Sequence, residues 1–431
     1  MGTKIYTLKN NRKLIFYPRK ETNGILIDLQ FKAGAINDFP NKQGLAHFCE
    51  HAIFSFSTKD KTYEEKTKLF QKLRVNGFTS AYNMVFRICS TEETFKQSID
   101  LIIDSINNLQ YNENEFIKEK NVIENEIALR NNDNDRLLSL IQRSFLKHAK
   151  ISNLKNYSYA GTNESLSNIT IKDIEKFIKT YLTINNLTVI ACGNINKKTL
   201  KYFISKLNSL PISAKKGIES KNLTKLCPPK AVLQPSNEKD CSIIQLWYKI
   251  DRYSNIKEPT QDILYSLSNK VLSNILFKYF RKDKSLCYSI QKISDLIGDN
   301  TFSLIHIPCA NSNLNKIIQE YPKFLSQLNI EEIKENFAQI KEKMLYDYNF
   351  DIQSLYEIKN EIKNVYFRYN RLYNKKFIKE REQTIKEVTF EDFYIFFKKA
   401  LNSKPYVIIL YNDKIEFDYN KFTKKIANAL K

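Results

Sequence analysis

The chain has 431 residues, 42% of them hydrophobic and 13% aromatic, which is enough for two or three folded domains and excludes a disordered protein. Its net charge of +21 would suit nucleic acid, but the lysines are spread along the sequence and no RNA-recognition or zinc-finger pattern occurs. No apolar run approaches the roughly 18 residues that span a bilayer. Neither nucleic acid nor a membrane is therefore expected as a partner.

The seven cysteines are odd in number and form no Cys-x-x-Cys pair. Several lie in apolar runs, as is typical of reduced core residues in an intracellular protein. The first residues contain no apolar signal segment. The expected location is therefore the cytoplasm.

The N-terminal part begins with two predicted strands, over residues 13–18 and 24–33. In the second, apolar side chains alternate with more polar ones, which indicates a strand with one buried face. A turn-rich connection containing Pro40 leads from these strands into a helix.

This helix contains the spacing His-x-x-Glu-His, formed by His47, Glu50 and His51. Residues three and four apart are neighbours on a helix, so the two imidazoles and the carboxylate share one face. Another face is apolar and could be buried; it consists of Leu45, Phe48, Ala52 and Phe56. The pattern is the inverted form of the His-Glu-x-x-His zinc helix.

Two neutral imidazoles one turn apart can bind one Zn²⁺, provided that a third ligand, usually a carboxylate, comes from elsewhere and leaves one position for water. The metal lowers the pKa of that water to about 7. Glu50 would then accept its proton and later return it to the leaving amine. The five-residue pattern alone does not separate this site from two solvated histidines, so the third ligand decides.

A second helix is predicted over residues 63–73, followed by a strand over 78–89. Thr91 is the predicted cap of the next helix, whose apolar residues recur with a period of 3.6.

Residues 115–127 are predicted to form a Glu-rich helix. Glu119 and Glu126 are seven residues apart and stand on nearly the same face, whereas Glu124 points away from both. Either Glu124 or Glu126 could supply a carboxylate ligand. The shared face favours Glu126 as the ligand, with Glu119 as a supporting carboxylate that orients a histidine.

The sequence pattern of residues 170–190 recurs at 389–409, an offset of 219 residues without a gap. Each copy has a Thr-x-x-Asp cap, an amphipathic helix and an apolar strand. This repeat predicts an α+β protein of two similar domains, each a mainly antiparallel sheet packed with helices. The expected boundaries are 1–212 for an N-terminal zinc-binding domain, 213–235 for a proline-containing linker, and 236–431 for a C-terminal domain.

The second domain is predicted to begin with a strand over residues 242–250, which carries the only tryptophan, Trp247. A helix follows over 263–275, and a long Lys/Glu-rich helical stretch runs over 331–372. This domain has no His-x-x-Glu-His pattern. Its His306 lies in a strand-like run, where a core or surface histidine is more common than a metal ligand.

With these motifs, the chain resembles the pitrilysin/insulinase family of zinc metallopeptidases, in the half-length form that includes the mitochondrial processing peptidase and small bacterial processing proteases. The resemblance rests first on residues 31–34 and 44–51, around the zinc helix. It rests also on the run from Glu119 to Glu126, which matches the family's Glu-x-x-Val-Ile-x-x-Glu. Glu126 follows His51 by 75 residues, as the third zinc ligand does in the family. The resemblance thus implies one Zn²⁺ per chain, held by His47, His51 and Glu126, with Glu50 and Glu119 as catalytic and supporting carboxylates.

In the second domain, Arg281 and Tyr288 match the family's Arg-x(6)-Tyr segment, with Ser285 and Cys287 in place of a glycine and an alanine. In the family this pair holds the substrate backbone and helps to stabilise the developing oxyanion. A guanidinium and a phenol can both donate to a carbonyl oxygen that gains charge.

The segment that binds substrate departs from the family. Where the family has Asn-Ala-aromatic-Thr, this chain has Ser80-Ala81-Tyr82-Asn83, and the loop that follows is shorter. In the family this strand is a sheet edge that pairs with the peptide. Ser80, Ala81 and Tyr82 are therefore the expected substrate-binding residues.

The resemblance implies a zinc-dependent endopeptidase that hydrolyses short or unfolded peptides inside a dimeric chamber. Because one chain carries both the zinc ligands and the Arg/Tyr pair, a homodimer is favoured over a heterodimer, with Arg281 and Tyr288 acting in trans. The alternative is a non-catalytic interaction subunit of a heterodimeric peptidase of the same fold.

Overall fold

The computed structural model describes residues 2–130, 160–218, 226–235, 241–250, 259–297, 300–412 and 415–430. They fall into two compact units. The first contains the described residues up to 222 together with 351–377, and the second contains those of 223–350 and 378–431. Within the described ranges, no helix is both long and apolar enough to cross a membrane.

The first unit is built on a six-stranded sheet in the order β1-β2-β6-β3-β5-β4. Its strands are β1 (Lys4–Thr7), β2 (Lys13–Pro18), β3 (Ile25–Phe31), β4 (Arg74–Thr79), β5 (Met84–Ser90) and β6 (Leu187–Gly193). All neighbours are antiparallel except β2 and β6. The predicted strands over 13–18 and 24–33 are thus confirmed.

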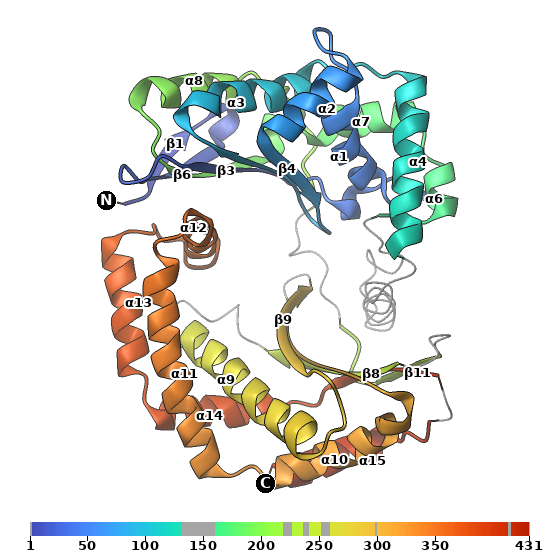
Figure 1. The fold of residues 1–431 in the computed structure, drawn as a ribbon, viewed down its shortest axis with the longest axis vertical. Helices are drawn as coiled ribbons and strands as arrows, with labels where there is room; N and C mark the ends of the chain where they lie inside the picture. Colours follow the sequence, from blue (N-terminus) through green and yellow to red (C-terminus); the bar gives the residue numbers. More distant parts are fainter. Residues whose placement is uncertain are drawn as a thin grey trace. The chain divides into compact units, whose positions relative to one another are not determined.

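Most helices of this unit cover one face of the sheet (Figure 1). They are α1 (Leu45–Ser55), α2 (Tyr63–Lys72), α3 (Glu92–Asn107), α4 (Glu113–Arg130), α6 (Asn163–Ser167), α7 (Ile171–Tyr181) and α8 (Lys197–Leu207), with short 3-10 turns η1 (Lys9–Asn11), η2 (Ala35–Asn37) and η3 (Ile184–Asn186). Alternate side chains of β3 enter the core beneath them, namely Ile25, Ile27, Leu29 and Phe31. The opposite face is covered by α12 (Leu355–Tyr369), which packs against β3 and β6.

The prediction of one strand over 78–89 is wrong, because the chain makes a hairpin there. The N–H of Ser80 donates to the carbonyl of Asn83 over 2.8 Å, and the Ser80 hydroxyl donates to the same carbonyl. Ser and Asn close such turns through their short polar side chains, whereas the apolar Ala81 and Tyr82 made the segment look continuous. The hairpin makes β4 the edge strand of the sheet.

The second unit has a five-stranded sheet in the order β7-β11-β8-β10-β9. Its strands are β7 (Ala231–Pro235), β8 (Ser242–Ile250), β9 (Gln291–Ile297), β10 (Asn300–Cys309) and β11 (Tyr406–Tyr411). Only β7 and β11 are parallel. This pair stands where β2 and β6 stand in the first sheet, so the internal repeat read from the sequence is a repeat of topology. The α+β fold with two mixed, mainly antiparallel sheets follows the prediction.

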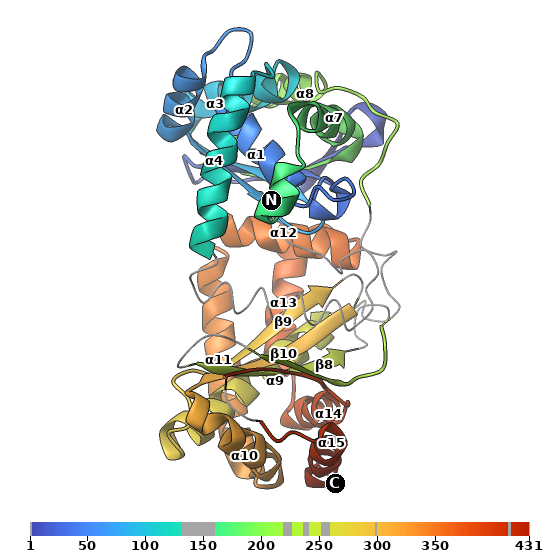
Figure 2. The same ribbon diagram turned by 90° about the vertical axis from the view of Figure 1, so that its right-hand side faces the viewer.

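The helices of the second unit are α9 (Pro259–Phe277), α10 (Leu314–Ser326), α11 (Ile330–Asp351), α13 (Lys375–Glu387), α14 (Phe390–Leu401) and α15 (Tyr419–Ala429), with a π-helical turn η5 (Lys278–Asp283) and a 3-10 turn η6 (Asn311–Asn313). Figure 2 shows α10, α14 and α15 together on one side of the sheet. The two repeat helices, α7 and α14, begin at the predicted caps: the Thr170 and Thr389 hydroxyls accept the N–H of Asp173 and Asp392.

The predicted helical stretch over 331–372 is two helices rather than one. Helix α11 ends at Asp351, and the Ser354 side chain caps α12 by accepting the N–H of Glu357. The apolar residues keep a helical spacing across this cap, so the sequence pattern predicted one continuous helical stretch. The break transfers α12 to the first unit. The domain boundaries at 212 and 236 stay a prediction, and β7 lies in the stretch predicted as a linker.

His306, for which the sequence left a core or a surface position open, lies in the core of the second unit. It is 8% exposed on β10, and the Gln245 amide donates to its Nδ1 over 2.8 Å. The Trp247 indole N–H donates to the Gln245 oxygen. Burial lowers the pKa of His306 to about 4.

This depressed pKa predicts acid sensitivity. Because the folded protein resists protonation of His306 until about pH 4, while the unfolded chain binds the proton near pH 6.5, stability is complete above pH 6.5 and falls as the pH decreases toward 4. Between pH 7 and pH 5 the loss expected from His306 alone is about 2 kcal/mol, whereas the Asp38 carboxyl, whose pKa is raised by burial to about 8, acts in the opposite direction. Urea unfolding of the wild type and of His306→Gln at both pH values measures this contribution as the difference between the two chains. His306→Gln should remove most of this loss, and an equal loss in the variant would refute the assignment.

Candidate metal centre

Helix α1 carries His47, Glu50 and His51, and its N-terminus is fixed by a carboxylate from the preceding loop. Asp38 accepts the backbone N–H groups of Gly44 and Ala46, each over 2.7 Å. Gly44 has φ +93°, and a Cβ there would lie 2.7 Å from the carbonyl oxygen of Ala160. The left-handed turn and the close approach both require glycine at this position.

The C-terminus of α1 is fixed by a buried lysine. The Lys66 ammonium, which is fully buried, donates to the carbonyls of Ile53 and Phe56 in the last turn of the helix. Burial lowers the pKa of Lys66 to about 7. A cation at this end satisfies unpaired carbonyls and matches the helix dipole. Both ends of the histidine-bearing helix are therefore held by groups from outside it.

The predicted apolar face of α1 is fully buried; Leu45, Phe48, Ala52 and Phe56 are 0% exposed. The ring of Phe48 stacks on Phe116 of α4 with centroids 5.1 Å apart. This contact sets the position of α4 against α1. The polar face of α4, which begins one turn after Phe116, then lies beside the two histidines.

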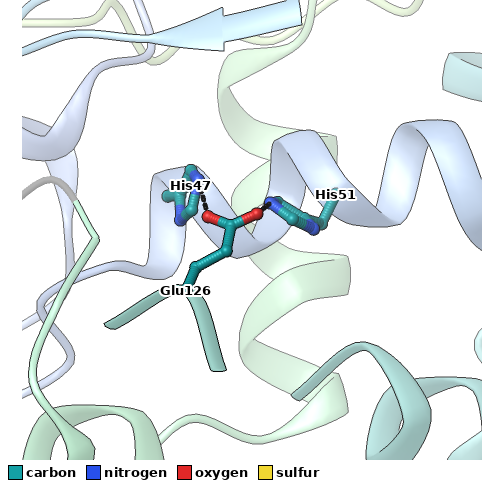
Figure 3. Close-up of side chains that lie close together, drawn as sticks. All are labelled: His47, His51 and Glu126. Atoms are coloured by element: carbon teal, nitrogen blue, oxygen red, sulfur yellow. Dashed lines mark ion pairs between the residues drawn. The ribbon is translucent and has the colours of Figure 1, made fainter. Parts of the chain in front are cut away.

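Three side chains from these two helices meet at one point (Figure 3). Nε2 of His47 lies 3.6 Å from Oε2 of Glu126, and Nε2 of His51 lies 3.5 Å from Oε1 of the same carboxylate. One ligand atom from each residue lies within 4.8 Å of the others. The structure brings Glu126, rather than Glu124, to the histidines.

The three side chains fit a zinc ion. With ligand bonds of about 2.0–2.2 Å, a tetrahedral ion separates its ligand atoms by roughly 3.4 Å. The two nitrogen–oxygen distances, 3.6 and 3.5 Å, are close to that value. Two imidazoles and one carboxylate are also a typical donor set for zinc in hydrolases. These residues would hold the ion and leave one ligand position open.

Glu119 contacts the ring nitrogen of His51 that faces away from Glu126. Its Oε2 lies 3.2 Å from Nδ1 of His51, and the Tyr63 hydroxyl donates to its Oε1 over 2.7 Å. Burial raises the pKa of Glu119, but the hydrogen bonds from His51 and Tyr63 outweigh it, and the net shift is downward. An ionised Glu119 accepts the Nδ1 proton of His51, so the lone pair on Nε2 faces Glu126.

Loss of this support should weaken metal binding without abolishing it. We expect Glu119→Gln to lower the zinc affinity about 10–100-fold, because the neutral amide no longer fixes the tautomer and orientation of His51. Tyr63→Phe, which removes only the second hydrogen bond, should have a smaller effect. Competition with a chromophoric chelator measures both. Unchanged affinity in Glu119→Gln would contradict the supporting role.

Glu50 lies beside the edge strand β4. It is 9% exposed, and the Thr79 hydroxyl donates to its Oε2 over 2.6 Å. A Cβ at Gly77 would lie 2.9 Å from Oε1 of Glu50 and 2.4 Å from the Phe54 ring. The strand therefore passes the Glu50 carboxylate at a distance that only glycine permits.

Sequence reasoning missed Thr79, Gly77 and Tyr63 as members of this site. The contacts of Thr79 and Tyr63 join elements that are 29 and 56 residues apart, and a single threonine or tyrosine carries no motif. Gly77 did leave a signal, because a glycine inside a strand often marks a close backbone approach.

The expected substrate residues Ser80, Ala81 and Tyr82 lie in the turn after β4. The carbonyls of Ser80 and Ala81 accept the N–H groups of Ala35 and Ile36. The turn is thus tied to the loop before α1, and the strand that passes Glu50 is β4 itself.

Arg281 and Tyr288 lie together in the second unit. The guanidinium carbon of Arg281 is 4.5 Å from the centroid of the Tyr288 ring, and this ring is 79% exposed. Between them, Ser285 has φ +52°, a left-handed conformation that suits the glycine of the family pattern. The partly exposed Arg281 and the exposed Tyr288 can both donate hydrogen bonds to a ligand.

Two family models match the chain. Residues 16–155 match the model described as Insulinase (Peptidase family M16), and residues 168–344 match the model described as Peptidase M16 inactive domain. The first match contains both histidines and Glu126, and the second contains Arg281 and Tyr288.

Relatives and solved structures agree with these matches. The chain is 25% identical over 195 residues to the zinc protease PqqE of Helicobacter pylori, covering 44% of this chain and 43% of that protein. It is 22% identical to the uncharacterized zinc protease YmxG of Bacillus subtilis, covering 75% and 78%. The first half of the periplasmic protease PqqL from Escherichia coli has the same fold, with a TM-score of 0.78, 16% identity, and coverage of 99% of this chain and 97% of that one.

Proposed function

The chain belongs to the insulinase (M16) family of peptidases, and on that premise we propose that it is a zinc-dependent endopeptidase that hydrolyses short or unfolded peptides. The observation that carries this proposal is that His47, His51 and Glu126 come together at distances that suit a zinc ion. Glu50 lies on α1, the helix that carries the two histidines. The three proposed zinc ligands and the proposed proton acceptor are thus present in one chain.

A zinc ion held by His47, His51 and Glu126 would supply Lewis acidity, which polarises a carbonyl group and lowers the pKa of water. The protein residues position and move the proton. Glu50 accepts a proton from the attacking water and returns it to the leaving amine. The Thr79 hydroxyl donates to Oε2 of Glu50 and helps to fix the orientation of this carboxylate. Glu119 keeps His51 in the tautomer that binds metal.

We propose that the substrate pairs with β4 as an added strand. This strand is the sheet edge, and it passes Glu50 at Gly77. An edge strand offers unpaired backbone groups to a peptide, and pairing would lay the peptide backbone beside the catalytic carboxylate. Ser80, Ala81 and Tyr82 would then border the end of the bound peptide.

Arg281 and Tyr288 complete the site in this proposal. Both can donate hydrogen bonds to a carbonyl oxygen that gains negative charge. We propose that the chain forms a homodimer in which the pair acts on the partner's substrate, a heterodimer being the alternative assembly. The seven cysteines form no disulfide, which fits the cytoplasmic location that we propose.

Mixing two inactive chains tests the sharing of sites. Glu50→Gln and Arg281→Ala chains should each be inactive or strongly impaired alone, and a refolded mixture should regain about one intact site per mixed dimer. Cleavage of a fluorescence-quenched peptide measures the recovery. A mixture of Glu50→Gln with the Glu50→Gln/Arg281→Ala double variant is the control and should stay inactive. No recovery in the first mixture would contradict sharing in trans.

A further inference from the structure

The two faces of β4 differ sharply in chemistry. Val75, Gly77 and Thr79 face α1, as the buried Val75 and the contacts of Gly77 and Thr79 with α1 show. The residues between them therefore project to the opposite face, toward α12, because strand side chains alternate. These residues are Arg74, Asn76 and Phe78, and Arg74 and Asn76 are exposed while Phe78 is 40% exposed.

Arg87 lies beside them on the same face. It stands directly opposite Asn76 in the β4–β5 pairing. Its guanidinium lies between two aromatic rings, 5.0 Å from the centroid of Phe78 and 4.9 Å from that of Tyr356 on α12. Tyr356 is 47% exposed. The guanidinium thus lies between two partly exposed aromatic rings, next to the edge strand β4.

A buried carboxylate fixes this guanidinium. Nε and Nη2 of Arg87 donate to the two oxygens of Asp28 over 2.7 and 2.9 Å, while the ammonium of Lys359 donates to Asp28 over 2.7 Å. Asp28 and Lys359 are 5% and 2% exposed. A guanidinium has five N–H donors, so the two hydrogen bonds to Asp28 and the one to Tyr356 still leave donors of Arg87 for a ligand.

The positive charge around Asp28 exceeds the negative charge. Lys363 follows Lys359 by one helical turn on α12 and is exposed. The pKa of Lys363 is lowered, first by desolvation and then by Lys359 and Arg87, and Asp28 acts in the opposite direction. Asp28 therefore pairs with two cations while Lys363 adds a third positive charge nearby, and a further negative charge would stabilise the group.

We propose that this surface is a specificity subsite for an acidic side chain of the substrate, with Arg87 as the main contact and Lys363 as its neighbour. The proposal rests on the function proposed above, in which a peptide strand pairs with β4. In such a strand every second side chain points to the α12 face. A carboxylate on one of these side chains reaches the Arg87 guanidinium between Phe78 and Tyr356, and the side chains between point toward α1.

Peptide binding to the full-length Glu50→Gln chain tests this subsite, because binding can be measured without cleavage. The probes are fluorescein-labelled peptides of one length, each with a single Glu at a successive position, and matched peptides with Gln there. At one or more positions, Glu should bind about tenfold more tightly than Gln, the effect of one charge-assisted hydrogen bond. Arg87→Gln should reduce this ratio to about twofold or less.

Two further variants separate the subsite from general charge and from misfolding. Lys363→Gln changes an exposed side chain and should reduce the ratio about threefold. Lys201→Gln, which removes an exposed lysine from α8 on the other face of the sheet, should leave it unchanged. Arg87→Gln retains the ion pair between Asp28 and Lys359, so we expect it to fold. If it does not fold, the Glu-to-Gln binding ratio of Lys363→Gln tests the subsite instead.

The proposal is overturned if no peptide binds, if Glu binds no better than Gln at any position, or if the ratio survives in Arg87→Gln and Lys363→Gln. Cleavage by the wild-type chain keeps the two proposals apart. If the wild-type chain cleaves neutral and acidic peptides equally well, only the proposal of an acidic subsite is contradicted. If the chain binds acidic peptides through Arg87 but the wild type never cleaves them, only the proposed peptidase function is contradicted.

Discussion

Glu50→Gln is expected to lower peptide cleavage by about 10³-fold while leaving the zinc content unchanged. The glutamine amide has the shape of the carboxylate and can still accept the Thr79 hydroxyl, but it cannot accept a proton from water. Glu50 is not among the three residues that meet at the metal position. The variant therefore separates proton transfer from metal binding.

Initial rates on a quenched peptide, together with elemental analysis of the purified chain, measure both effects. Glu93→Gln, a change of the same chemistry at an exposed position of α3, is the matched control and should behave as wild type. Retention of more than about a tenth of the wild-type rate in Glu50→Gln would be too much for the loss of a general base. Glu50 would then not be the proton acceptor.

His51→Ala is expected to abolish zinc binding at micromolar zinc, and activity with it. If a binding free energy of roughly 10 kcal/mol is shared among three ligands, removal of one costs about 3 kcal/mol, or a factor of about 100 or more. His51 also connects Glu126 to Glu119, so its loss leaves Glu119 without its imidazole partner. The wild-type chain should retain one equivalent of zinc.

Zinc stoichiometry after gel filtration measures this effect. His306→Gln is the matched control, because it removes a histidine from the other unit and should leave one equivalent in place. A full equivalent of zinc in His51→Ala would place the metal elsewhere. No zinc in the wild type as well would remove the basis of the proposed chemistry.

The positions of the proposed ligands could be predicted because each depends on spacing along a helix. His47, Glu50 and His51 are placed by one turn of α1, and Glu119 and Glu126 by two turns of α4. Helical periodicity left Glu124 and Glu126 as alternatives; the shared face favoured Glu126, and the resemblance to the family selected it. The structure adds that the stacking of Phe48 on Phe116 brings the two helices together.

The rest of the site depends on contacts that spacing does not encode. Thr79 reaches Glu50 only because the chain turns at Ser80 and makes β4 an edge strand, and the predicted single strand concealed that turn. Asp38 and Lys66 hold the ends of α1 through backbone groups, which any sequence supplies. The break before α12, which Ser354 caps, was hidden by a continuous helical pattern.

Zinc titration of the apoprotein tests the central claim most directly. After dialysis against a chelator, the wild-type chain should have no activity on a quenched peptide library. Activity should rise in proportion to added zinc and reach a plateau at one equivalent per chain. Cleavage that persists in the apoprotein, or that never appears as zinc is added, would contradict a zinc peptidase built on His47, His51 and Glu126.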